Sequence, residues 1–164
     1  MIEKTWPITD KLIFNALHLT GQLYWQLSQE ADILGKSPQP DAIAAIAATK
    51  KQLVMQLEQF HQQCGQILAT EQLPNNRDGM KTYFQRAQSA GLAVADVMNQ
   101  WTQIQLVYTE CRTLNEKNGA GIELLAYHAK RALQILKGGP RDSNTYGPDG
   151  ATQSAAFTRT LILV

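Results

Sequence analysis

The residues with metal-binding chemistry are few and do not combine into a site. Glu58 and His61 have the Glu-x-x-His spacing that carries carboxylate-bridged metal pairs in helical bundles. Such a site needs a second copy of that pair and two more inward-facing glutamates. His18 and His128 have no carboxylate three residues before them. The sequence therefore predicts no metal centre.

Phosphate-binding and nucleophilic chemistry have no better support. Gly35-Lys36-Ser37 resembles the end of a phosphate-binding loop, but Glu30 stands where the first glycine is required. The chain has 3 histidines, and none has a plausible nucleophile to activate. We therefore expect no enzymatic activity and no cofactor.

Charge and composition narrow the choice of partners. The chain has 164 residues, with Lys+Arg 15 against Asp+Glu 14 and a net charge of +1. Without a basic run, neither nucleic acid nor an anionic membrane surface is an expected partner. No stretch reaches the roughly 18 apolar residues of a membrane span, and residues 1–7 contain no apolar signal segment. We expect a soluble cytoplasmic protein.

Apolar periodicity predicts helices over about residues 9–35, 41–72, 77–90 and 92–137. Thr9 or Asp10 is expected to cap the first helix, with Ile8 and Ile13 packed across that cap, and Asp41 is expected to cap the second. Whether Gly91 breaks the chain between the last two helices is open. We treat 1–137 as a helical domain and 138–164 as a mobile tail, whose apolar end, Leu161–Val164, could dock on the domain or on a partner.

Each long helix has one apolar seam with steps of three and four residues, which is typical of helices that pack side by side. The fold expected is all-α: an elongated antiparallel helical hairpin or a three-helix, coiled-coil-like bundle with a flexible C-terminal tail. Cys64 and Cys111 fall on these seams, so they are expected to be small buried hydrophobic residues.

Two asparagines, Asn115 and Asn118, interrupt the seam of the last helix. A polar residue at a seam position can fix helix register at some cost in stability. Alternatively, this part of the seam stays semi-polar because its partner is transient. Gly119 and Gly121 favour the second reading, since glycine inside a helix is unfavourable unless another backbone comes close. The residues alone leave both readings open.

The segment from Cys111 to Thr152 resembles the C-terminal half of FlgN-type flagellar export chaperones. The resemblance is carried by Leu114-Asn115-x-x-Asn118-Gly119 and by Tyr146-Gly147-x-x-Gly150 further along the chain. The first half of the chain shares only its helical, coiled-coil-prone character with that family.

The resemblance implies a chaperone of bacterial type III flagellar export. It would bind the C-terminal helices of hook–filament junction proteins, prevent their premature assembly and deliver them to the export gate. A client helix would need an apolar groove, which the last helix offers if the other helices leave it partly uncovered. The predicted client-binding residues are Ile104, Tyr108, Cys111, Leu114, Asn115, Asn118, Gly119, Ile122, Leu125 and Ala129.

By the same resemblance, Tyr146, with Gly147 and Gly150, is predicted to bind the cytoplasmic domain of the export gate. The alternative is that Tyr146 folds back onto the helices. Whether the free chaperone is a monomer or a homodimer is open. The rival function is a structural or adaptor coiled coil acting through permanent self-association.

Overall fold

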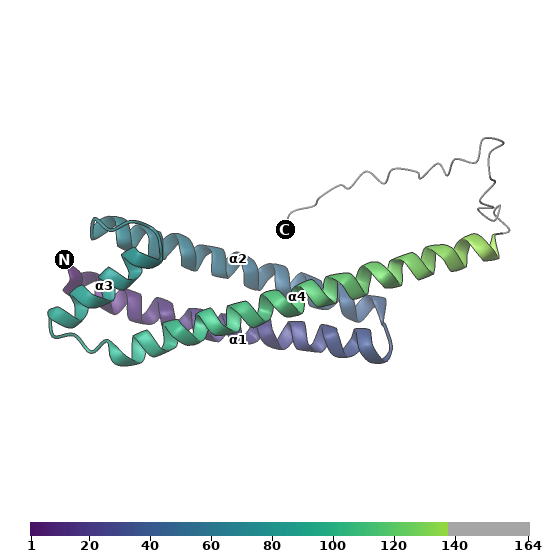
Figure 1. Ribbon diagram of the computed structural model, residues 1–164, viewed down its shortest axis with the longest axis horizontal. Coiled ribbons are helices and arrows are strands. Elements are labelled where there is room, and N and C mark those ends of the chain that lie inside the picture. The colour runs from purple at the N-terminus through teal and green to yellow at the C-terminus, as the bar shows by residue number, and fades with distance from the viewer. Residues whose placement is uncertain (138–164) are drawn as a thin grey trace, which may run out of the picture. The chain divides into compact units, whose positions relative to one another are not determined.

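The computed structural model describes residues 1–137 and contains four helices, α1 (Ile2–Lys36), α2 (Pro40–Thr70), α3 (Arg77–Ser89) and α4 (Ala95–Leu136), with no strand among the described residues (Figure 1). This confirms the all-α fold class. The chain divides into two compact units, Met1–Leu124 and Leu125–Val164. The predicted tail, including Leu161–Val164, lies outside the described residues.

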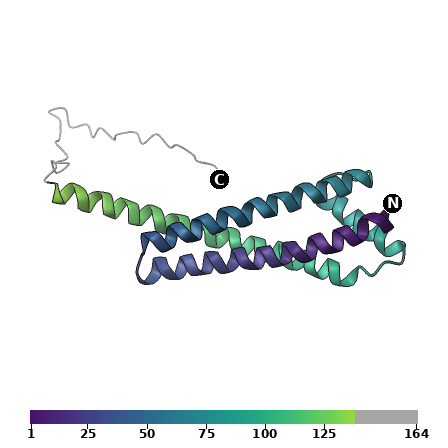
Figure 2. The same ribbon diagram turned by 180° about the vertical axis from the view of Figure 1, so that it is seen from behind.

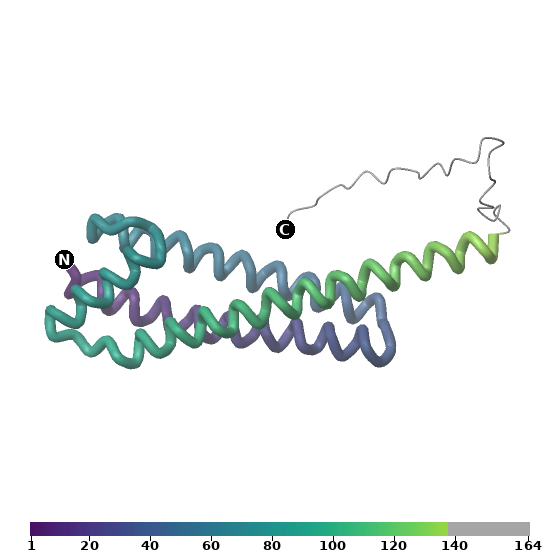
Figure 3. The backbone as a smooth tube through the Cα atoms, viewed as in Figure 1, coloured from purple at the N-terminus to yellow at the C-terminus, as the bar shows by residue number. Residues whose placement is uncertain are grey.

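In the first unit, α1 and α2 form an antiparallel hairpin whose backbones approach closely (Figures 1 and 3). Part of α4 packs beside this hairpin and runs parallel to α1. The thiol of Cys111 lies 4.0 Å from the carbonyl oxygen of Thr20, and Asn118, seven residues on, reaches the carbonyl of Leu27. The direction of the chain is therefore up, down and up in α1, α2 and α4, and α3 provides the connection between the last two.

The predicted start of the first helix is wrong. Helix α1 begins at Ile2 and continues through Pro7, although proline removes one backbone donor and is unfavourable inside a helix. The reason is tertiary packing. Trp6 is only 7% exposed and stacks on Tyr83 of α3, while the Thr5 hydroxyl donates a hydrogen bond to the Glu71 carboxylate at 2.8 Å.

The predicted cap of α1 is also corrected. Thr9 is buried inside the helix, where its hydroxyl donates to the Thr5 carbonyl and lies 2.9 Å from the Tyr83 hydroxyl. Burial is the main reason why the pKa of Tyr83 is raised. Ile8 is exposed whereas Ile13 is fully buried, so the two do not pack across a helix end.

The second helix begins one residue earlier than predicted. Gln39 is its N-cap residue, without a side-chain hydrogen bond, and Pro40 occupies the first turn, where its fixed φ suits a helix start. Asp41 is therefore not the cap. It lies in the first turn, where a carboxylate interacts favourably with the helix dipole.

The connection around Gly91 settles the open question about the third and fourth helices. The side chain of Asn76 caps α3 by accepting a hydrogen bond from the Gly79 amide at 2.8 Å. Helix α3 ends at Ser89, and Gly91 has a φ of +78°, a left-handed conformation that favours glycine. Helix α4 then begins at Ala95, three residues later than predicted.

Two apolar clusters form the core of the first unit. The larger joins all four helices around Ile13, Phe60, Tyr83, Phe84 and Val97. The smaller lies further along α1, α2 and α4, and consists of Leu23, Leu27, Leu53, Leu57 and Cys111. The predicted seams of α1 and α2 supply half of the ten residues named, Leu23, Leu27, Leu53, Leu57 and Phe60, so apolar periodicity was a usable signal for these helices.

Candidate functional site

One row of seam residues on α4 packs against the hairpin of α1 and α2. Val97, Ile104, Cys111 and Asn118 follow one another at seven-residue intervals, and all four are at most 6% exposed. Since seven residues make almost two helical turns, they share one face of the helix. This face is the structural contact of α4 within the first unit.

The seam residues of α4 that alternate with these four are more exposed to solvent. Trp101 is half-buried, Tyr108 is 45% exposed, Asn115 is exposed and Ile122 is 36% exposed. Leu106, which lies off the seam, is 62% exposed. The result is an apolar surface along α4 that its own unit covers only in part.

The predicted client-binding residues therefore fall into two groups. Ile104, Cys111 and Asn118 are buried, so they contact the rest of the chain and would meet a client only after α4 had moved. The expectation of a vacant seam is wrong for these three positions. The accessible or half-buried positions are Tyr108, Leu114, Asn115, Gly119, Ile122, Leu125 and Ala129.

Asn118 belongs to a polar network inside the bundle. Its amide nitrogen donates to the carbonyl oxygen of Leu27 at 2.8 Å and to Oε2 of Glu30 at 2.9 Å. Glu30 is only 1% exposed, and Lys50 Nζ donates to both of its carboxylate oxygens at 2.9 and 2.8 Å. A buried charge of this kind requires a paired and hydrogen-bonded environment, which α2 and α4 together supply.

The two asparagines thus have different roles. Asn118 fixes the position of α4 on α1, in agreement with the structural reading of a polar seam residue. Asn115 is exposed and only accepts a long hydrogen bond of 3.4 Å from Lys50 Nζ. Gly119 lies in the sequence between these asparagines and Ile122. A Cβ atom added at Gly119 would meet no atom within 4 Å, so the space beside it is open.

The described part of the second unit, residues 125–137, is the last part of α4 and is rich in exposed apolar residues. Leu125 is half-buried and Ala129 is exposed. Tyr127, Leu133, Ile135 and Leu136 are between 54% and 82% exposed. Of these four, only Leu136 lies on the predicted seam, which runs through Ile122, Leu125, Ala129 and Ala132, and none was a predicted client contact. Their clustering just before Gly138-Gly139-Pro140 is the sequence signal that would have revealed them.

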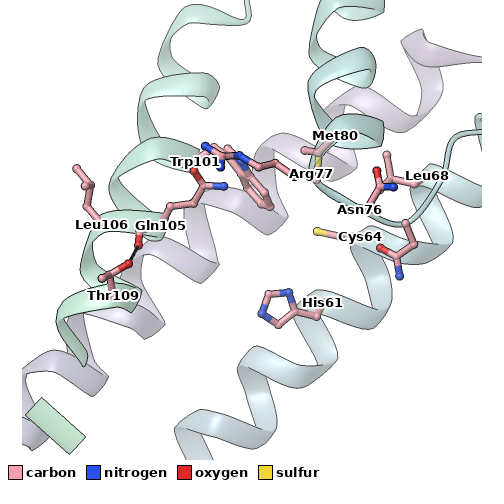
Figure 4. A pocket seen from close by; sticks show the side chains of 11 residues that line it. His61, Cys64, Leu68, Asn76, Arg77, Met80, Trp101, Gln105, Leu106 and Thr109 are labelled. Carbon is pink, nitrogen blue, oxygen red and sulfur yellow. Dashed lines mark hydrogen bonds between the residues drawn. The ribbon is translucent and has the colours of Figure 1, made fainter. Parts of the chain in front are cut away.

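A pocket of about 620 Å³ lies among α2, α3 and α4 in the first unit. Figure 4 shows His61 and Cys64 projecting from α2 towards the gap that Trp101 and Gln105 border from α4. Burial raises the pKa of the Cys64 thiol to about 11, so at neutral pH it is protonated and a poor nucleophile. The pocket therefore lacks an activated nucleophile.

The second thiol behaves in the same way. Burial raises the pKa of Cys111 to about 11, and both cysteines are free and buried, which confirms their predicted role as small core residues. No cluster of metal-binding side chains occurs within residues 1–137. In that same part of the chain, no helix combines the length and apolar character needed to cross a membrane. Tyr146, Gly147 and Gly150 lie outside the described residues.

The fold and the site define a helical protein whose candidate functional surface is an exposed apolar helix face, of the kind that binds another helix. The chain matches the family described as FlgN protein over residues 12–154. It belongs to this family of flagellar export chaperones, which is not a family of enzymes. Comparison with curated proteins and with solved structures found no match.

Proposed function

We propose that this FlgN-family chaperone binds the C-terminal helical segments of hook–filament junction proteins in the cytoplasm and prevents their premature assembly. The observation that carries the proposal is the row of exposed apolar residues on α4, including Tyr108, Ile122 and Leu133. An amphipathic client helix would cover such residues at intervals of three, four and seven positions.

Burial within the chaperone refines the predicted contacts. The client contacts proposed in the first unit are Tyr108, Leu114, Asn115, Gly119 and Ile122, and those proposed on the last part of α4 are Leu125 and Ala129. Ile104, Cys111 and Asn118 hold α4 in place instead. Ordering a flexible client costs several kcal/mol, so an extended apolar face suits this task better than the small pocket beside Cys64.

The test is a charge placed on the proposed contact face. Ile122→Asp and Leu125→Asp should each weaken client binding by at least about ten-fold, because an aspartate there must be desolvated against an apolar client. Binding is measured by calorimetry with a peptide of the client's C-terminal helix. Circular dichroism should show unchanged helix content.

Ala120→Asp is the matched control. Ala120 is exposed and lies roughly 160° around the helix from Ile122, on its opposite side. This variant should bind the client like the unaltered protein. Full binding by both Ile122→Asp and Leu125→Asp would refute the proposed contact face.

We further propose that Tyr146, with Gly147 and Gly150, binds the cytoplasmic domain of the export gate and so delivers the client. This step rests on the resemblance of the segment Thr145–Gly150 to the family pattern. Tyr146→Ala should leave client binding intact and reduce secretion of the junction proteins. Unchanged secretion and motility would remove Tyr146 from the proposal.

A further inference from the structure

The solvent-facing side of α1 lacks the charges that a surface helix normally carries. Residues 12–29 contain no aspartate, glutamate, lysine or arginine. Two large aromatic residues on this side, Phe14 and Trp25, are 62% and 61% exposed. An uncharged surface with two exposed aromatic rings is typical of a surface that is covered in an assembly.

Between these rings, the surface is shaped to accept a helix. Phe14, Gly21 and Trp25 line a groove of about 720 Å³, which Thr49 and Leu53 of α2 border on the other side. Figure 2 shows α1 and α2, the two helices that line it, side by side. A methyl group at Gly21 would meet no atom within 4 Å.

Nothing within the described chain therefore requires glycine at position 21, where alanine would favour the helix. The absence of a side chain does allow the backbone of a second helix to come close. The groove fits a helix that brings its own large apolar side chains.

We propose that the occupant is a second copy of this chain, with the two α1 helices packed antiparallel about a two-fold axis between Leu19 and Thr20. An isologous contact pairs positions that lie equally far before and after the axis. Phe14 then faces the partner subunit's Trp25, and His18 faces the partner subunit's Gly21. Each copy supplies both a large side chain and the space that receives one.

The charges at the ends of α1 favour this arrangement. Glu3 and Lys36 are both exposed, and the antiparallel register places Glu3 of one copy opposite the partner subunit's Lys36. Lys4 lies about one helical turn from the position opposite the partner subunit's Asp32, close enough for a weaker attraction. A parallel pairing would instead bring like charges together at both ends.

This groove is lined by residues of α1 and α2 and includes none of the proposed client contacts on α4. Self-association through α1 and client binding through α4 are therefore independent, and the dimer would carry two clients. The inference does not depend on the proposed client or on the export gate.

The experiment measures the dissociation constant of the full chain by analytical ultracentrifugation. Phe14→Glu and Trp25→Lys should each weaken the dimer by at least about thirty-fold, as expected for aromatic residues at the centre of an interface. Combining the two should restore at least about ten-fold of that loss, because the new carboxylate at position 14 would face the new ammonium at position 25 of the other copy.

Asn15→Glu is the control, since Asn15 is exposed and lies beside the face rather than on it. It should leave the dissociation constant unchanged. Gly21→Ala should weaken the dimer while raising the helix stability of the monomer, a combination that a folding defect cannot produce.

Two results would overturn the proposal. One is an unaltered protein that stays monomeric over the whole concentration range. The other is a double variant no stronger than the single variants, which would assign this face to a different partner. Neither result affects the client-binding test, because Phe14→Glu leaves α4 unchanged.

Discussion

The first part of α4, from Ala95 to Asn118, and its last part, from Ile122 to Leu136, carry apolar residues at similar helical spacing. In the first part, every seventh residue from Val97 onward is buried against the hairpin of α1 and α2. In the last part, the seam residues Ile122 and Leu136 are 36% and 82% exposed. A seam therefore indicates which residues can pack, but not whether another element of the chain covers them.

The border between the two parts is polar. Asn118 is the last buried residue of α4, and it binds the Glu30 carboxylate that Lys50 neutralises. Such a network is costly to bury and depends on every member being present. It fixes where the covered part of α4 ends.

The largest effect is expected when this network is broken. Lys50→Met should lower the free energy of unfolding by about 3–5 kcal/mol, because it leaves the buried Glu30 carboxylate without its counter-charge. Urea denaturation followed by circular dichroism measures the change. Lys36→Met removes an ion pair to Asp32 whose side chains are 79% and 66% exposed, and it should cost less than about 0.5 kcal/mol. Equal losses would contradict the buried role of Lys50.

A second pair of variants compares the two parts directly. Ile104→Ala should cost about 3 kcal/mol of unfolding free energy, because it leaves a cavity beside the larger core cluster. Leu133→Ala, at a position that is 54% exposed, should change stability by less than about 0.5 kcal/mol. A large loss from Leu133→Ala would show that the last part of α4 is covered in solution.

Substitutions of the two asparagines test where the buried part of α4 ends. Asn118→Ala should cost about 2 kcal/mol, because it removes two hydrogen bonds and leaves the Leu27 carbonyl without this partner. Asn115→Ala removes one long, exposed contact and should be nearly neutral. If Asn115→Ala were the more damaging, the assignment of register to Asn118 would be wrong.

The smallest effect on stability at neutral pH is expected from the two cysteine thiols. Because burial raises the pKa of Cys64 and Cys111 to about 11, both should react slowly with iodoacetamide in the native protein at pH 8 and rapidly after unfolding. The folded state retains these protons above pH 9, whereas the unfolded state loses them. Stability should therefore fall as pH rises from about 9 to about 11, and double replacement by alanine should reduce that slope.

The sequence by itself determined the helices and their inward faces. The seams of α1 and α2 were readable because burial in a helix recurs every three or four residues, so the signal is local. The family was likewise recognisable from the Leu-Asn-x-x-Asn-Gly pattern around Asn118, which the match over residues 12–154 confirms.

Only the tertiary structure decided which residues those faces meet. Thr9 and Asp10 predicted a later helix start as cap residues, but contacts of Thr5 and Trp6 with residues more than sixty positions away outweigh the cost of a proline inside the helix. Glu30 gave no local signal of burial, and its partners Lys50 and Asn118 lie on other helices. The apolar periodicity belongs to a single helix and can be read from its residues alone. Whether its side chains are buried depends on contact with a second helix, which is established only when the chain folds.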